Sequence, residues 1–188
     1  MTLHRVDLRS CPSQPWRNGG GQTRELLAWP AGGEWQLRVS VADIDRDGPF
    51  SAFPGVQRWF AVLSGAGVQL GLADGGKPLT PMSPPLAFDG AEAPGCHLLD
   101  GPTRDLNLMA RQAAGRALMT AGAWGEPLGA GARWRGVFTV VAGRLLCGDT
   151  PVAVPAGALA WSDDDTLPWQ FVPAEPGPSW WLTLEGSE

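Results

Sequence analysis

The chain has 188 residues, with 14 basic side chains against 19 acidic ones and a net charge of −5. This length suits one domain or two small fused units, with a core large enough to need no disulfide staples. The acidic balance argues against a nucleic-acid or anionic-membrane surface, so neither partner is expected.

Targeting and redox features indicate a cytoplasmic protein. No charge-free apolar run approaches the ~18 residues of a membrane-spanning helix, and the start "MTLHRVDLRS" lacks the apolar core of a secretion signal. The three cysteines, Cys11, Cys96 and Cys147, are far apart and form no C-x-x-C motif. Such spacing is not a disulfide framework, and a reducing compartment is the simplest interpretation.

Glycine and proline are frequent throughout the chain, at 26 and 18 residues, which favours an all-β fold with many turns. The first distinctive element is "PWRNGGGQTREL", residues 15–26. It lacks the lysine of a Walker loop and the following helix of a dinucleotide loop. We therefore interpret it as a tight turn that needs glycine for positive φ or close backbone approach. It would aim nearby side chains in fixed directions: Trp16, Asn18, Thr23, Arg24 and Glu25.

The clearest strand is "WQLRVSVA", residues 35–42, because apolar residues alternate with Arg38, Ser40 and Ala42. The run 56–63 is more continuously apolar, as expected for a strand covered on both faces. Shorter strands are predicted at 68–72, 86–88, 96–99, 103–109, 136–141, 144–147, 152–154, 158–161, 169–172 and 179–185. A helix is conceivable over 110–119, although Gly115 interrupts it.

Two segments share a plan of strand, glycine turn and strand, followed by a proline-rich turn and a further strand. They are "FAVLSGAGVQLG" (60–71) and "FTVVAGRLLCGD" (138–149). The repeat suggests two similar small barrels or sandwiches joined through residues 112–135. Convergence of turn chemistry is the alternative explanation.

A metal centre has little support in this sequence. Its two histidines, His4 and His97, offer no H-x-H or H-x-x-x-H spacing. No G-x-S-x-G motif marks a serine hydrolase. We therefore expect no metal or other cofactor, and we assign no catalytic residue.

The blocks "PWRNGGGQTREL", "WQLRVSVADI", "DGPFSAFPGVQRWFAVLSGAG", "FDG" and "LLDGPTRDLNLMAR" occur in this order. Together they resemble the HutD/Ves family of bacterial proteins over roughly residues 15–111. The resemblance implies a bicupin-like fold, with cupin-type halves at 1–112 and 113–188. It also implies an association with histidine utilisation, in which a carboxylate such as urocanate or N-formylglutamate is sensed or buffered. Where metal-binding cupins would carry histidine ligands, this chain has Ser51, Phe53 and Arg58.

A small-molecule pocket is expected where polar residues alternate within apolar strands. Arg38 cannot lose its charge and needs a carboxylate, supplied either by Glu25, Asp100 or Asp105 or by a ligand. Ser40 shares its face, and Thr103, Asp105 and Asn107 share a face of the later strand. Trp16 and Phe53 are the expected walls. The predicted ligand-binding set is Trp16, Asn18, Thr23, Arg24, Glu25, Arg38, Ser40, Ser51, Phe53, Arg58, Asp105 and Asn107.

Three functions remain open from the sequence. The first is a non-catalytic protein that binds an anionic carboxylate or acylated amino acid and regulates histidine utilisation. The second is a metal-independent cupin enzyme, an isomerase or hydrolase, with Glu25, Asp105 or His97 as acid/base. The third is a partner-binding module that uses an apolar barrel surface. The fold analogy also allows a homodimer.

Overall fold

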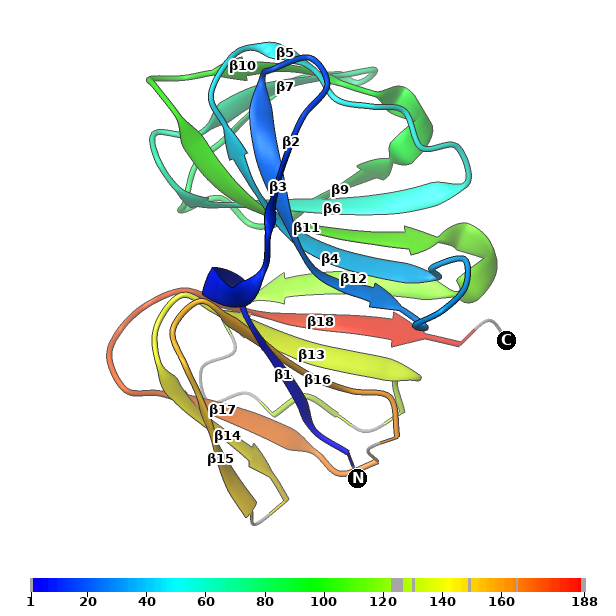
Figure 1. The fold of residues 1–188 in the computed structure, drawn as a ribbon, viewed down its shortest axis with the longest axis vertical. Helices are drawn as coiled ribbons and strands as arrows, with labels where there is room; N and C mark the ends of the chain where they lie inside the picture. The colour runs from blue at the N-terminus through cyan, green and yellow to red at the C-terminus, as the bar shows by residue number, and fades with distance from the viewer. Residues whose placement is uncertain (1, 123–126, 130, 149, 165, 187–188) are drawn as a thin grey trace. The chain divides into compact units, whose positions relative to one another are not determined.

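The computed structural model describes residues 2–122, 127–129, 131–148, 150–164 and 166–186 (Figure 1). The chain divides into two compact units. The first unit is Pro12–Ala113, and the second unit is Met1–Cys11 together with Ala114–Glu188. The sequence predicts residues 1–11 in the first half. The structure places them with the second because strand β1 (His4–Asp7) pairs antiparallel with β16 (Ala158–Ser162).

The first unit contains two antiparallel sheets. The six-stranded sheet has the order β2-β3-β4-β11-β6-β9, and the four-stranded sheet has the order β5-β10-β7-β8. Their bounds are β2 (Ser13–Pro15), β3 (Gly21–Trp29), β4 (Leu37–Ile44), β5 (Gly48–Pro49), β6 (Val56–Ser64), β7 (Val68–Leu72), β8 (Gly75–Leu79), β9 (Leu86–Asp89), β10 (Gly95–Leu98) and β11 (Thr103–Arg111).

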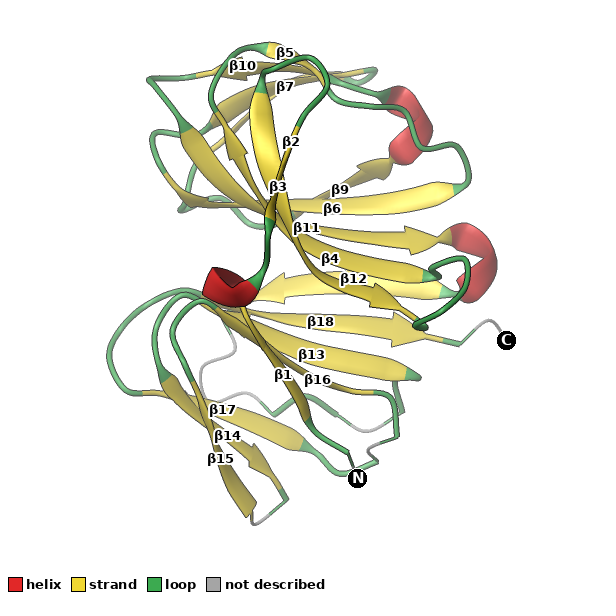
Figure 2. Ribbon diagram, viewed as in Figure 1, coloured by secondary structure: helices red, strands yellow, loops and turns green. Residues whose placement is uncertain are grey.

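The second unit also contains two antiparallel sheets, ordered β1-β16-β13-β18-β12 and β15-β14-β17. Its remaining strands are β12 (Arg116–Ala121), β13 (Trp134–Thr139), β14 (Gly143–Cys147), β15 (Thr150–Val154), β17 (Trp169–Pro173) and β18 (Ser179–Glu185). Helical structure in the described residues is limited to single 3₁₀ turns at Leu8–Ser10, Gly90–Glu92 and Gln112–Ala114 (Figure 2).

The two units use the same connectivity, which gives the sequence repeat a structural counterpart. Strands β6 to β11 pair with one another as strands β13 to β18 do, with β4 and β12 in the same flanking position. The pairing leaves strand edges in every sheet, so neither unit closes by hydrogen bonding into a barrel within the described residues. The fold is all-β.

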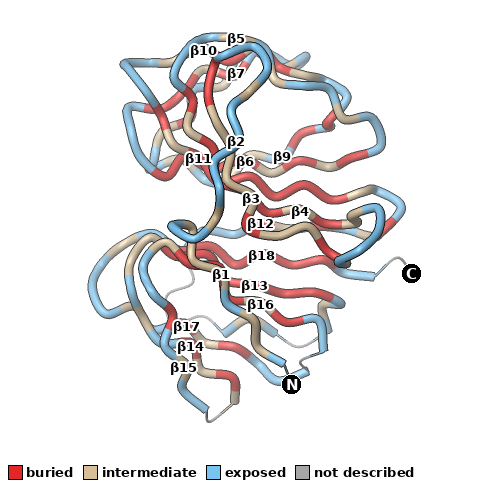
Figure 3. The backbone as a smooth tube through the Cα atoms, viewed as in Figure 1, coloured by how far each residue is buried: buried red, intermediate tan, exposed pale blue. Residues whose placement is uncertain are grey.

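Alternation along the strands explains the core of the first unit (Figure 3). Leu37, Val39 and Val41 of β4 are fully buried on one face. The opposite face of β4 points toward an apolar cluster built from both sheets of this unit. Its members are Ile44, Phe60, Val62, Val68, Leu70, Leu79, Phe88 and Cys96. Burying each large apolar side chain contributes about 1.5–3 kcal/mol, and this cluster therefore holds the sheets face to face.

Every strand predicted over 35–109 and 136–185 is present, with ends that differ by a few residues. The strands β1, β2, β3, β5, β8 and β12 were not predicted. The helix conceived over 110–119 is wrong, because β11 and β12 occupy its two ends. Gly115 between them adopts φ +126° and lies against the Glu185 carbonyl. The expected connector 112–135 contains β12, and its residues 123–126 and 130 lie outside the described part.

Among the described residues, no helix has the length and apolar character needed to cross a membrane.

Candidate functional site

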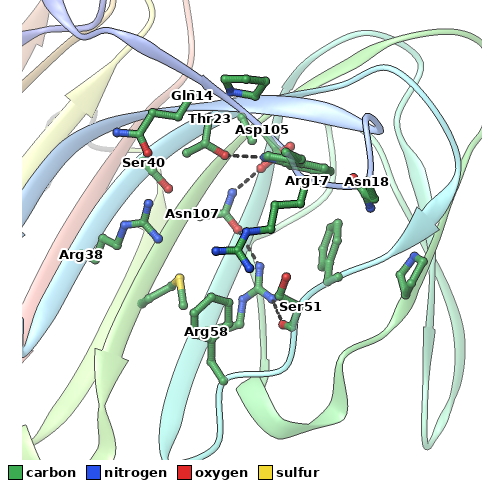
Figure 4. A pocket seen from close by; sticks show the side chains of 17 residues that line it. Gln14, Arg17, Asn18, Thr23, Arg38, Ser40, Ser51, Arg58, Asp105 and Asn107 are labelled. Atoms are coloured by element: carbon green, nitrogen blue, oxygen red, sulfur yellow. Dashed lines mark hydrogen bonds between the residues drawn. The ribbon is translucent and has the colours of Figure 1, made fainter.

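A cavity of about 410 Å³ opens in the first unit, on the inward face of the six-stranded sheet (Figure 4). Its floor comes from β3, β4, β6 and β11. Its rim comes from the β2–β3 turn and the segment after β5. The lining residues are Gln14, Pro15, Trp16, Arg17, Asn18, Thr23, Arg38, Ser40, Ala42, Pro49, Phe50, Ser51, Phe53, Arg58, Asp105, Asn107 and Met109.

Strand register brings the polar floor residues together. On β11, Asp105 pairs with Ala42 of β4, and Asn107 pairs with Ser40. One row further along, Met109 lies between Arg38 of β4 and Arg58 of β6. Because residues directly opposite each other in a sheet point to the same face, these rows form one polar patch. The alternation seen in the sequence therefore does place Arg38, Ser40, Asp105 and Asn107 in one site.

The triple-glycine turn shapes the rim of the cavity, and glycine is required at each of its three positions for a different reason. Gly19 adopts φ +69°. At Gly20 the backbone N–H donates to the Asn18 side-chain oxygen at 3.0 Å, and an added Cβ would crowd that oxygen. At Gly21 a Cβ would lie 2.3 Å from the Asp43 carbonyl oxygen. The turn thus requires positive φ and close approach together, and it holds Trp16 and Asn18 at the cavity.

Two wall residues are fixed by neighbours within the same unit. The Trp16 indole donates to Thr23 Oγ1 at 2.8 Å, which locks the ring against β3. Phe53 is held through its backbone N–H, which donates to the Gly90 carbonyl at 2.7 Å.

Arg58 is a buried cation at the floor, only 7% exposed. Its Nη1 donates to the Ser51 carbonyl at 3.5 Å and its Nη2 to Asn107 Oδ1 at 3.3 Å. Three aromatic rings surround the guanidinium, with centroids 5.0, 5.8 and 5.0 Å away at Phe50, Phe53 and Phe88. Burial lowers the pKa of Arg58 to about 10, an effect that the nearby Asp105 opposes. The group remains a cation at neutral pH.

Asp105 is the cavity's one carboxyl among the described lining residues, and it is 1% exposed. Burial raises its pKa to about 8, although a hydrogen bond from Asn107 and the charge of Arg58 oppose the shift. Its Oδ1 accepts from Asn107 Nδ2, while its Oδ2 is buried without a hydrogen-bond partner. Burial thus favours the protonated, uncharged form of Asp105.

Two further arginines reach the cavity. Arg38 Nε donates to Glu25 Oε2 at 2.6 Å, so the internal partner is Glu25, one of the carboxylates proposed from the sequence. Arg38 forms no other hydrogen bond among the described residues, and its guanidinium lines the cavity. Arg17 projects into the cavity from the β2–β3 turn (Figure 4). The charged groups on the lining are thus arginines.

Arg24 and Glu25 were predicted at the site, but they do not line the cavity. Glu25 acts only through Arg38. Arg24 lies on the other face of β3, where Nη1 donates to Asp43 Oδ2 at 3.0 Å. Arg104 also binds Asp43, at 2.6 Å. Burial disfavours the charge of Asp43, but hydrogen bonds and attraction from the two arginines outweigh this and lower its pKa.

His97, an acid/base candidate from the sequence, lies elsewhere. It is exposed, and its Nδ1 is 3.0 Å from Asp47 Oδ2. Nor does the lining fit a cupin-type metal, because it offers one uncharged carboxyl and no histidine or cysteine. No group of three His, Cys, Asp or Glu suited to a metal occurs in the described part of the chain.

Most of the predicted residues line the cavity: Trp16, Asn18, Thr23, Arg38, Ser40, Ser51, Phe53, Arg58, Asp105 and Asn107. The sequence interpretation missed Arg17, which sits in an exposed turn with no periodic pattern to show its direction. It also left Phe50 without a wall role, since an aromatic residue before a strand is usually core.

Comparisons with known proteins agree on one family. The HutD family model matches residues 8–152. The chain is 43% identical over 102 residues to an uncharacterized 21.2 kDa protein in the hutC 3′ region of Pseudomonas putida, a match that spans only 52% of this chain and 53% of that protein. It is 32% identical over 167 residues to protein Ves of Citrobacter koseri, covering 84% and 82% of the two chains.

Solved structures show the same relationship. HutD from Pseudomonas fluorescens SBW25 superposes with a TM-score of 0.87 at 26% identity, over the full length of both chains. A cupin 2 conserved barrel domain protein from Leptotrichia buccalis, at 13% identity and a TM-score of 0.58, shares the fold alone.

Proposed function

Because the chain belongs to the HutD family, we propose that its cavity binds a small carboxylate metabolite and that this binding serves a regulatory, non-catalytic role in histidine utilisation. The hut names carried by the Pseudomonas relatives support this setting. A bicupin-like architecture and a cytoplasmic location belong to the same proposal. The shared connectivity of the two units supports the first, and the buried Cys96 thiol is compatible with the second.

The observation that carries the proposal is the charge of the cavity. Arg17, Arg38 and Arg58 line it, and burial raises the pKa of the single carboxyl among the described lining residues, Asp105, to about 8. Of these three arginines, Arg38 alone forms an ion pair with a carboxylate in the described part of the chain, and its partner is Glu25. In a protein of net charge −5, such an uncompensated cluster of guanidinium groups suits an anion. Each charge-assisted hydrogen bond to a ligand carboxylate contributes about 1.5–3 kcal/mol.

The wall residues of the cavity indicate the chemistry of the ligand beyond its carboxylate. Trp16, Phe50 and Phe53 supply apolar surface beside the arginines, as expected for a ligand with a short carbon skeleton or a planar ring. N-Formylglutamate and urocanate are the two ligands we propose. Both have a carboxylate for the arginines and an apolar or planar part for the walls.

Isothermal titration of the purified full chain with these two compounds tests the proposal. Arg38→Ala should weaken binding at least ~tenfold, the loss of one charge-assisted contact. Arg104→Ala is the matched control, because Arg104 binds Asp43 on the opposite face of the same sheet, and its affinity should stay unchanged. Failure of both compounds to bind the wild-type protein refutes the proposed function.

A metal-independent enzyme is the second candidate, and Asp105 is the observation that favours it. A buried carboxyl with its pKa raised to about 8 is poised to exchange a proton near neutral pH. NMR spectra of N-formylglutamate or urocanate incubated with the protein decide the matter. Turnover that disappears in Asp105→Asn supports the enzyme, whereas unchanged spectra support binding alone.

A further inference from the structure

Arg17 is the one arginine of the cavity lining that no protein group holds within the described residues. Its neighbours in the turn are fixed: the Trp16 indole donates to Thr23 Oγ1 at 2.8 Å, and Asn18 Oδ1 accepts from the Gly20 N–H at 3.0 Å. Arg17 itself is exposed and forms no hydrogen bond or ion pair with a described residue. Its side chain projects over the cavity (Figure 4). A well-held turn therefore presents a guanidinium whose donors are available to a ligand.

Arg38 offers a second set of accessible donors, at the floor. Its Nε donates to Glu25 Oε2 at 2.6 Å, and its two terminal nitrogens have no partner among the described residues. The Arg38 side chain is 22% exposed, and neither terminal nitrogen is buried away from solvent. Because this side chain lines the cavity, both nitrogens can donate to a carboxylate that enters it.

Arg58 adds a positive charge beside Arg38. The two residues lie on either side of Met109, in one row across β4, β11 and β6. Burial is the main cause that lowers the pKa of Arg58 to about 10, and the charge of Arg38 also lowers it, whereas Asp105 opposes the shift. A carboxylate held by Arg38 would relieve the repulsion between the two guanidinium groups. This row, Arg38 and Arg58, is the floor row.

Arg17 and the floor row belong to opposite ends of the cavity. The turn that carries Arg17 leads into Gly21, which pairs with Ile44 at the end of β4. From Arg38 to Ile44 the strand rises about 3.3 Å per residue, or roughly 20 Å. Figure 4 shows Arg17 and Arg38 entering the cavity from different sides. The two guanidinium groups are thus placed to meet the two ends of an elongated ligand.

We propose that Arg17 determines the specificity of the cavity by selecting ligands that carry two carboxylate groups. The floor row holds one carboxylate through Arg38, and Arg17 donates to the other at the rim. The inference rests on the proposed function, since it names the class of ligand that the same site takes. A monocarboxylate of similar length binds the floor row alone and leaves Arg17 without a partner. No covalent bond changes.

A cycle of two ligands and two proteins tests the role of Arg17. Isothermal titration compares N-formylglutamate with 4-formamidobutyrate, which lacks one of its two carboxylates. The wild-type protein should bind N-formylglutamate at least ~tenfold more tightly. Arg17→Gln should weaken N-formylglutamate roughly five- to tenfold, a modest loss because Arg17 is exposed. The same variant should bind 4-formamidobutyrate within about twofold of the wild type. Ligand-observed NMR extends the measurement to weak affinities.

Two further variants separate direct contact from other effects of the substitution. Arg46 is exposed beside the same turn, where its backbone N–H donates to the Gly20 carbonyl at 3.1 Å, and it does not line the cavity. Arg46→Gln therefore removes an equal charge and should leave both affinities unchanged. Arg17→Lys keeps a positive charge at the rim and should recover most of the N-formylglutamate affinity. Thermal unfolding confirms that each variant is folded.

The outcomes separate this inference from the proposed function. Equal losses for both ligands in Arg17→Gln would mean that one carboxylate bridges Arg17 and the floor row, which overturns the selection of two carboxylates. Equal affinity of the wild type for both ligands overturns it as well. The role of Arg17 is refuted if Arg17→Gln binds normally, or if Arg46→Gln or Arg17→Lys binds N-formylglutamate as weakly as Arg17→Gln. In all these cases the wild-type protein still binds a carboxylate and the proposed function stands. If neither N-formylglutamate nor urocanate binds the wild type, the proposed function fails and this inference fails with it.

Discussion

The first and second units share one strand connectivity, and the cavity described above lies in the first unit. The difference is clear on the strands β11 and β18. Asn107 of β11 pairs with Phe60 of β6, and Trp181 of β18 pairs with Val137 of β13. Trp181 belongs to an apolar cluster with Trp169 and Phe171. A bulky indole thus lies in the apolar cluster of the second unit where the first unit has the small amide of Asn107 beside the cavity.

The two units even share a buried arginine. Arg58 lies two residues before the core residue Phe60, and Arg135 lies two residues before the core residue Val137. Arg135 is 1% exposed, its Nη1 donates to the Leu167 carbonyl at 2.6 Å, and its guanidinium lies 5.5 Å from the Trp169 ring centroid. An inward arginine is therefore part of the scaffold in both units. In the first unit this arginine lies beside small polar residues that line the cavity with it.

The first unit also has an element that the second lacks. The β2–β3 hairpin extends its large sheet beyond β4, whereas the corresponding sheet of the second unit ends at β12 in the described residues. The turn of this hairpin supplies Trp16, Arg17 and Asn18 to the rim. Small polar residues at the floor and a hairpin at the rim together distinguish the first unit from its counterpart.

The largest expected effect comes from Asp105→Ser, which makes the first unit resemble the second at this position. The corresponding residue of the second unit is Ser179, which pairs with Thr139. The folded pKa of Asp105 is raised to about 8 from 3.8. The folded protein keeps this proton while the unfolded chain loses it, so wild-type stability should fall between about pH 4 and 8, by up to ~5 kcal/mol. Asp105→Ser should lack this component.

Urea unfolding at a series of pH values measures the effect, and the comparison is between slopes. Asp47→Asn, with an exposed carboxylate, should retain the wild-type slope over the pH 5–8 window. Identical slopes for wild type and Asp105→Ser would show that Asp105 is ionised in the folded protein.

The second prediction concerns a variant that fills the cavity with an indole, the side chain found at the corresponding position of the second unit. Asn107→Trp places an indole at the position that corresponds to Trp181 and removes the amide between Arg58 and Asp105. N-Formylglutamate binding should weaken by more than ~100-fold, because the ring occupies the ligand's space and two polar contacts are lost. Isothermal titration gives the affinity. A folded variant that still binds normally would place the ligand elsewhere.

The third prediction contrasts the two buried arginines. Arg58→Met should weaken carboxylate binding roughly 10- to 100-fold, the value of one desolvated charge-assisted contact. Arg135→Met should leave the affinity unchanged and instead lower the unfolding free energy by about 1–3 kcal/mol, because the Leu167 carbonyl loses its donor. Paired titration and thermal unfolding check both. Equal effects of the two variants on affinity would mean that neither acts by direct contact.

Much of the site followed from sequence because alternation along a strand fixes the face of each side chain. That rule grouped Arg38 with Ser40, and Asp105 with Asn107, without any knowledge of the fold. It could not say which strands are neighbours, so it left Glu25, Asp100 and Asp105 as equal partners for Arg38. The register of β3 against β4 identifies the partner of Arg38, because Glu25 lies opposite Ser40 and beside Arg38.

Other features depend on contacts that no local pattern records. Arg17 follows no periodicity, and β8 has the weak strand sequence "GGKPL" but forms by pairing with β7. The repeat was visible, but aligning its two segments letter by letter matches Phe60 with Phe138. In the structure Phe60 and Val137 face the two cores. A shift of one residue in the alignment exchanges the two faces of a strand. Sequence similarity this weak does not distinguish between the two alignments.

The smallest predicted effect concerns the hairpin that only the first unit has. Gly21→Ala would place a Cβ 2.3 Å from the Asp43 carbonyl oxygen, a backbone atom that cannot rotate away. Separating β3 from β4 at this point should cost about 1–3 kcal/mol of unfolding free energy. It should also weaken carboxylate binding severalfold, because the turn that carries Arg17 shifts.

Gly33→Ala is the matched control for this hairpin, because a Cβ there meets nothing within 4 Å and its effect should stay within about 0.5 kcal/mol. Chemical denaturation and titration of both variants give the comparison. Loss of stability in Gly21→Ala with unchanged affinity would show that the rim contributes nothing to binding. The arginines of the floor would then account for the whole difference between the two units.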